Sequence, residues 1–151
     1  MGTAIDSDGY LRFGHYSPSF STIFYTDEVS NGFSTTTTIV SSVTVSHPID
    51  LFVDSNDDSR LVYVEDTGEV HLMTHTNSWA DLVITNNSIG EDFDSIWTSD
   101  DHLIYAQIAM VDGFKTLQVV QYNSSNTTHS NITTANSTSE FSISVINDKI
   151  A

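Results

Sequence analysis

Hydrophobic residues in this 151-residue chain occur in short alternating or β-branched runs, separated by turn-forming Asp, Asn, Ser and Gly. The pattern has a period of two, which is typical of half-buried β-strands rather than helices. It is clearest at residues 49–53, 60–64, 70–74 and 79–85, with Gly68 in a turn that favours positive φ. The sequence therefore predicts an all-β protein built of four-stranded units.

An acidic turn recurs along the chain at residues 6–9, 55–57, 99–101 and 147–148. The interval between successive turns, roughly 45 residues, predicts repeated sheet units. The flanking strands are expected at residues 3–5, 11–16, 23–26 and 33–40 in the first repeat, and at 95–98, 103–107 and 115–122 in the third, whose outer strand falls within 123–140. We expect one all-β domain over residues 1–151, with repeats at about 3–46, 47–92 and 93–140 and an extra strand at 141–151.

Residues 5–11 (Ile-Asp-Ser-Asp-Gly-Tyr-Leu) and 53–57 (Val-Asp-Ser-Asn-Asp), each followed by an aromatic-containing strand, carry a family resemblance. They resemble the Val-Asp-Ser-Asn-Gly-type β-propeller repeats of microbial surface proteins. They are also distantly similar to sialidase propellers, although Tyr10 follows Gly9 where the sialidase motif has Thr-Trp. The resemblance implies a β-propeller arc of three four-stranded blades plus the first strand of a fourth. A β-sandwich is the alternative, because short alternating strands also describe one.

Three blades are too few to close a propeller, which typically has about four to eight. Exposed sheet edges promote association, and a head-to-tail contact produces a ring or a filament. We therefore expect a non-enzymatic, extracellular or cell-surface assembly module that forms a homo-oligomer or polymer. The expected assembly strand, which would pair with another chain through main-chain hydrogen bonds, contains Phe141, Ile143, Val145 and Ile150. The alternatives are a glycan- or protein-binding propeller, with its ligand on the face of the acidic turns, and a glycosidase-type hydrolase.

The amino-acid composition limits the classes of partner that the chain can bind. The chain has 20 acidic and 4 basic residues and a formal charge of −16, which argues against nucleic-acid binding. The absence of cysteine excludes disulfides and thiolate metal sites. We expect no membrane span, because no apolar stretch approaches the roughly 20 residues required. No signal peptide is visible at the start, so either an export signal has been removed or the chain is part of something longer.

Asn-x-Ser/Thr sequons, which accept glycans in exported proteins, occur at five positions. They are Asn86, Asn123, Asn126, Asn131 and Asn136.

The acidic turn of the second repeat is a candidate calcium site, and no cofactor other than this calcium ion is expected. Asp54, Asn56, Asp58 and Glu65 occupy positions 1, 3, 5 and 12 of a calcium-binding loop. Position 6, however, is Ser59 rather than the glycine that such a loop requires. The competing interpretation is a hairpin turn in which Asp and Asn side chains bond to their own backbone.

Other polar and aromatic residues are expected to be structural, and no catalytic residue is predicted. His71 and His75 share one side of a strand and could chelate a metal, but such pairs are common on surfaces. Sialidases hold the carboxylate of their substrate with three arginines, whereas this chain has only Arg12 and Arg60. These two arginines occupy the same position of the repeat. We expect Tyr63, Tyr105 and Trp79 to pack between repeats rather than bind sugar.

Overall fold

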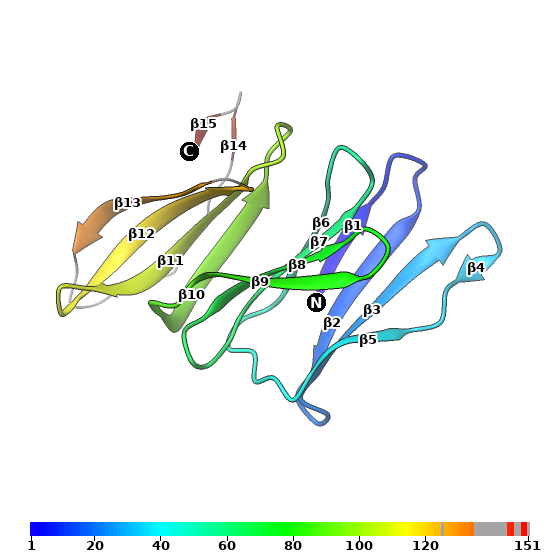
Figure 1. The fold of residues 1–151 in the computed structure, drawn as a ribbon, viewed down its shortest axis with the longest axis horizontal. Coiled ribbons are helices and arrows are strands. Elements are labelled where there is room, and N and C mark those ends of the chain that lie inside the picture. Colours follow the sequence, from blue (N-terminus) through cyan, green and yellow to red (C-terminus); the bar gives the residue numbers. More distant parts are fainter. Residues whose placement is uncertain (125, 135–144, 147–148, 151) are drawn as a thin grey trace.

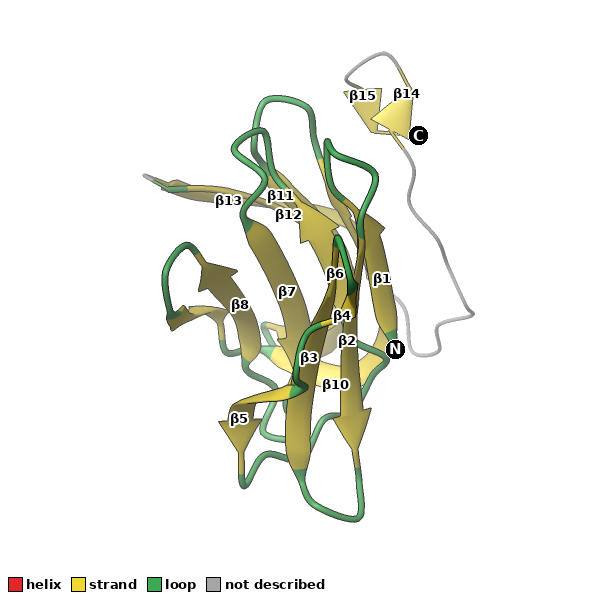
Figure 2. Cartoon of the chain, turned by 90° about the vertical axis from the view of Figure 1, so that its right-hand side faces the viewer, coloured by secondary structure: helices red, strands yellow, loops and turns green. Residues whose placement is uncertain are grey.

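The computed structural model describes residues 1–124, 126–134, 145–146 and 149–150. Strands and loops make up the described part of the chain (Figure 2), which contains no helix long and apolar enough to cross a membrane. The predicted all-β class is confirmed.

Within the described residues, the strands form three larger antiparallel sheets and one small one. The first sheet contains β1 (Gly2–Ile5), β2 (Leu11–Ser17), β3 (Thr22–Val29), β4 (Gly32–Phe33) and β5 (Thr37–Ser41). The second contains β6 (Asp50–Val53), β7 (Ser59–Val64), β8 (Val70–His75) and β9 (Trp79–Thr85). The third contains β10 (Ser88–Trp97), β11 (Leu103–Val111), β12 (Phe114–Asn123) and β13 (Asn126–Thr134).

Each sheet is a meander in which strands adjacent in sequence pair, except that β5 pairs with β3 past the short β4. The three sheets follow one another side by side in chain order (Figure 1). None of them closes on itself. The four strands expected in each repeat are therefore present, with β4 as an addition to the first.

Two predicted boundaries are wrong. The single strand expected at residues 33–40 is split into two strands that both pair with β3. Phe33, in β4, pairs with Glu28, whereas Thr37, in β5, pairs with Tyr25. Gly32, with φ of 126°, makes the turn that brings β4 back onto β3. The strand β10 starts at Ser88, well before residue 95, and it pairs with β11 through a register shift between Ser88 and Phe93.

The second sheet is the middle layer, because β7 is buried on both faces. Leu61 and Tyr63 point into a core shared with the first sheet, whereas Val62 and Val64 point into a core shared with the third. The buried residues of the first core are Ile23, Tyr25, Val43, Ile49, Leu51, Leu61, Tyr63 and Met73. Those of the second are Val62, Val64, Val70, Leu72, Leu103, Tyr105 and Val120. The expected packing of Tyr63 and Tyr105 is confirmed, and Trp79 packs against the first core while half-buried.

Each end sheet also has a face turned away from these cores. Because Gly14 and Tyr25 face the second sheet, strand alternation places Leu11, Phe13 and Phe24 on the opposite side, here called the leading face. Tyr105 faces the second core, so Ile104 lies on the other side of the third sheet. This trailing face contains Ile96, Ile104, Leu117 and Val119.

The expected assembly strand is only partly within the described residues. Val145 lies in β14 (Val145–Ile146) and Ile150 in β15 (Lys149–Ile150), and these two residues pair with each other in a small antiparallel sheet. Phe141 and Ile143 lie outside the described residues.

Candidate functional site

The acidic turns of the three repeats share one backbone geometry. In each, the first residue donates its N–H to the carbonyl of the fifth, at 3.0 Å for Asp6 to Tyr10 and for Asp54 to Asp58, and at 2.9 Å for Thr98 to His102. The fourth residue has positive φ in all three turns: 86° at Gly9, 63° at Asp57 and 61° at Asp101. Glycine and aspartate tolerate this conformation better than most residues.

The first side chain of each turn bonds back to the turn itself. Asp6 Oδ1 accepts the N–H of Asp8 at 3.1 Å and of Tyr10 at 2.8 Å. Asp54 Oδ1 accepts the N–H of Asn56 at 2.9 Å and of Asp58 at 3.0 Å. The hairpin-turn interpretation is confirmed for these residues.

Both arginines of the described repeats bind these turns. The guanidinium of Arg12 lies 3.0 Å from Asp6 Oδ2, and that of Arg60 pairs with Asp54 Oδ2. Arg60 also lies over the ring of Trp97, 5.8 Å from its centroid. The expected structural role of Arg12 and Arg60 is supported by these contacts.

The calcium candidates are not gathered at one point. Asp54 directs one carboxylate oxygen at its own turn and the other at Arg60, and Asp58 lies 3.7 Å from the same guanidinium. Asn56 remains in the same turn, but Glu65 comes after β7, at the far end of a six-residue strand. At about 3.3 Å per residue this strand separates Glu65 from the turn by roughly 20 Å.

Neighbouring turns are joined by matching hydrogen bonds. The N–H of Ser7 donates to Asp57 Oδ1 at 2.9 Å, and its hydroxyl donates to Asp57 Oδ2. The N–H of Ser55 donates to Asp101 Oδ1 at 3.1 Å, and its hydroxyl donates to Asp101 Oδ2. Each serine thus binds the positive-φ aspartate of the next repeat, and we call these two contacts the turn clasps.

We expect the turn clasps to weaken in acid. The hydroxyl and amide of Ser7 lower the pKa of Asp57, and the hydroxyl of Ser55, with Trp97 and the Ser55 amide, lowers the pKa of Asp101. A lowered folded-state pKa means that this stabilisation is present above about pH 4, the usual aspartate range, and is lost as the pH falls through the lowered values.

Thermal denaturation from pH 7 to pH 2.5 measures this effect. The variant that carries both Ser7→Ala and Ser55→Ala is compared with the unaltered chain. The double variant should unfold at a lower temperature at pH 7, and this difference should shrink below pH 4. A difference that is constant across the whole pH range would contradict the assigned role of the clasps.

A cavity of about 570 Å³ opens beside the turns of the second and third repeats. Its lining includes the aromatic rings of Trp97 and Tyr122 and the polar groups of Arg60, Asn56 and His102. Aromatic faces beside hydrogen-bonding groups are suited to polar ring-shaped ligands.

The sequons are distributed around the second and third sheets. Asn86 is exposed between β9 and β10, Asn123 is half-buried at the end of β12, and Asn126 is exposed at the start of β13. Asn131 belongs to β13, and Asn136 lies outside the described residues.

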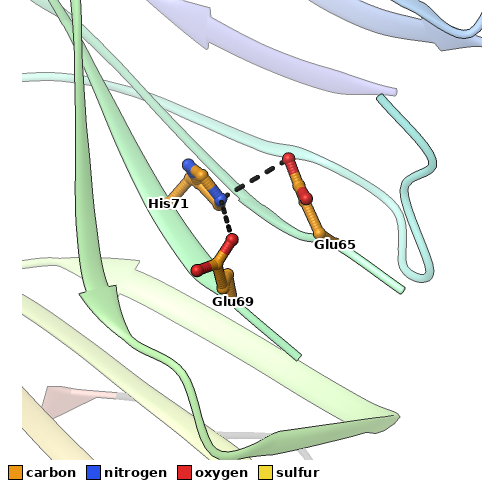
Figure 3. A group of neighbouring side chains, drawn as sticks. All are labelled: Glu65, Glu69 and His71. Atoms are coloured by element: carbon orange, nitrogen blue, oxygen red, sulfur yellow. Dashed lines mark ion pairs between the residues drawn. The ribbon is translucent and has the colours of Figure 1, made fainter. Parts of the chain in front are cut away.

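A second polar cluster lies at the other end of β7. Glu65 and Glu69 flank the turn between β7 and β8, and His71 follows on β8 (Figure 3). His71 Nε2 is 3.6 Å from Glu65 Oε1 and 3.8 Å from Glu69 Oε2. The sequence pattern pairs His71 with His75, but in the structure His75 contacts the rings of Tyr25 and Trp79 instead.

The environment of this cluster is strongly acidic. Burial raises the pKa of the adjacent Tyr63, and the negative charges of Asp81, Glu65 and Glu69 raise it further. Tyr63 is therefore a neutral phenol at physiological pH.

No family model matches the chain, and no curated protein matches it significantly.

Proposed function

We propose that this chain is a non-enzymatic assembly module with a propeller-type arrangement of sheets, which acts outside the cell or at its surface by associating with further copies of itself. The observation that carries the proposal is that the leading and trailing faces correspond to the faces that pack inside the chain. The internal cores therefore provide a template for packing between copies.

The acidic turns define the correspondence between repeats. The turns begin at residues 6, 54 and 98. Counting from these positions, Phe13 corresponds to Leu61 and Tyr105, which are fully buried in the two cores. Phe13 itself is only half-buried, and near it Ile5 is 63% exposed and Phe33 59% exposed. The first sheet thus presents, on its open side, side chains of the kind that its neighbours bury.

On the trailing face Ile104 is buried, at 6% exposure, whereas positions on the next strand remain partly exposed. Leu117 and Val119 are half-buried, and Val119 corresponds through strand pairing to Tyr25 and Leu72 of the earlier repeats. Tyr25 and Leu72 are both buried against the following sheet. Val119 therefore lacks, within the two cores, the partner sheet that its equivalents have.

A second copy is the occupant that this correspondence specifies. The hydroxyls of Tyr25 and Ser59 are 2.9 Å apart across the first interface, and Leu72 and Leu103 share the second core. The same step along the repeat pairs Val119 of one copy with Leu11 of the next. This contact is head-to-tail, so repetition produces a ring or a filament.

Light scattering on eluting fractions tests the proposal in 0.15 M salt, which screens repulsion between copies of charge −16. We expect masses above the 16.6 kDa of one chain, rising with concentration. Val119→Asp and Phe13→Asp should each weaken association at least about tenfold, because each buries an unpaired charge in the contact.

Phe20→Asp is the matched control, since Phe20 is 74% exposed in the turn between β2 and β3 and lies on neither face. A folded chain that stays at 16.6 kDa at all concentrations would contradict the proposal. Equal weakening by Phe20→Asp would show that the effect depends on charge rather than on the two faces.

A glycan-binding role is the second candidate, favoured by the cavity that Trp97 and Tyr122 line. A glycan array on the whole chain would identify a ligand, and Tyr122→Ala should then lower its affinity about tenfold or more through lost stacking. Tyr10→Ala, outside this cavity, is the control. Absence of any saturable glycan binding would remove this candidate.

A further inference from the structure

The imidazole of His71 is held in one orientation. Its Nδ1 lies 3.0 Å from both carboxylate oxygens of Asp81, and its ring stacks on that of Tyr63 at 4.6 Å with an interplanar angle of 10°. A carboxylate only accepts hydrogen bonds, so Nδ1 donates to Asp81, and Nε2 is the ring nitrogen left to bind a metal ion. Asp81 thus fixes which ring nitrogen faces away from it.

That nitrogen is buried and has no hydrogen-bond partner. His71 is 5% exposed, and Nε2 is among the buried polar atoms without a hydrogen bond. It faces Glu65 and Glu69, whose nearest oxygens are 3.6 Å and 3.8 Å away (Figure 3). Three possible ligand atoms therefore converge at one point. Two neighbouring carboxylates beside an unpartnered buried nitrogen are favourable only when a cation lies between them.

The spacing of these atoms fits a small metal ion. One ligand atom from each of Glu65, Glu69 and His71 lies within 4.8 Å of the others. A metal bound at about 2.0–2.2 Å from each atom requires ligand separations of about 3.0–3.6 Å. Side-chain shifts of roughly 1 Å or less complete this geometry.

The turn that holds the two glutamates is anchored through its backbone. Glu65 N–H donates to the Glu69 carbonyl at 2.9 Å, and Asp66 N–H donates to the carbonyl of Thr44 at 3.0 Å. Ser88 N–H donates to the carbonyl of Gly68 at 3.2 Å. The ligand atoms are therefore carried by β8 and by a turn that neighbouring segments hold in place.

We propose that Glu65, Glu69 and His71 bind a divalent first-row transition-metal ion, of which Zn²⁺ is the model, and that Asp81 orients the histidine from behind. One imidazole and two carboxylates suit such ions, whereas Ca²⁺ and Mg²⁺ prefer oxygen ligands alone. Three protein ligands leave a coordination position for water or for a group from a partner. The carboxylate behind the ligating histidine matches the arrangement that commonly supports metal-bound imidazole.

Titration of the whole, untagged chain with Co²⁺ tests the proposal through the visible d–d absorption of the bound ion, followed by competition with Zn²⁺ and Ca²⁺. We expect one equivalent to bind, Zn²⁺ to displace it and millimolar Ca²⁺ to leave it bound. Glu65→Gln, Glu69→Gln and His71→Gln should each weaken binding at least about tenfold, and Asp81→Asn about ten- to a hundredfold.

Asp66→Asn is the matched control, because Asp66 is exposed on the same turn and its loss changes the charge equally. Circular dichroism of each variant establishes that it is folded. No saturable Co²⁺ binding by the unaltered chain would overturn the proposal, and would leave a proton on Nε2 as the occupant. Equal weakening by Asp66→Asn, or binding lost only with His102→Gln, would also overturn it.

Discussion

Leu61→Ala should destabilise the folded chain by about 2–5 kcal/mol, the usual cost of truncating a buried leucine. Leu61 is fully buried in the first core, and its Cδ1 lies 2.8 Å from the position that a Cβ on Gly14 would occupy. The first sheet therefore approaches so closely that the lost methyl groups leave a cavity in the interface. Urea denaturation followed by circular dichroism measures the free energy of unfolding.

Leu82→Ala is the matched control, because Leu82 lies in β9 and is 44% exposed. Its substitution should change the free energy of unfolding by no more than about 0.5 kcal/mol. Equal effects of the two substitutions would show that the first and second sheets do not share a core.

Gly68→Ala should destabilise the chain by about 2–4 kcal/mol, through an unfavourable backbone conformation and a steric clash. Gly68 has φ of 89°, and a Cβ there would lie 2.2 Å from the carbonyl oxygen of Ser88. Relief of this contact requires the turn to move away from the start of β10. The same movement would displace Glu65 and Glu69, so metal binding should weaken as well.

Gly113→Ala separates the two causes. Gly113 has a similar φ of 83°, but nothing lies within 4 Å of the position of its Cβ. This substitution should cost only about 1–2 kcal/mol for the backbone conformation. Thermal or urea denaturation of both variants gives the difference, and equal costs would contradict the close approach of Gly68 to Ser88.

Local patterns predicted most of the strands, because alternation and turn residues act over short distances. The strand expected at residues 79–85 coincides with β9, and that at 60–64 differs from β7 by one residue. The early start of β10 was not predicted, since residues 86–94 are rich in turn-forming residues. Pairing with β11 and the hydrogen bond from Ser88 to Gly68, both long-range in sequence, stabilise that segment.

The polar contacts likewise divide into short-range contacts that the sequence predicted and long-range contacts that it did not. Hydrogen bonds within the turn that begins at Asp54 span four residues or fewer, and the turn interpretation anticipated them. The bond from Ser7 to Asp57 joins residues 50 apart and depends on how two sheets pack. Asp81 reaches His71 only through the register of β8 and β9, which the hydrophobic pattern does not specify to within a residue.

The head-to-tail contact between copies is tested most directly by cysteine crosslinking, because the chain has no cysteine of its own. Leu11→Cys and Val119→Cys are introduced into separate, differently tagged chains, which are mixed and treated with a bismaleimide of about 10 Å, the distance between packed sheets. We expect crosslinks between the two kinds of chain and none within either kind. Crosslinking of like chains only, or no crosslink in a sample that associates, would contradict the packing of the trailing face on the leading face.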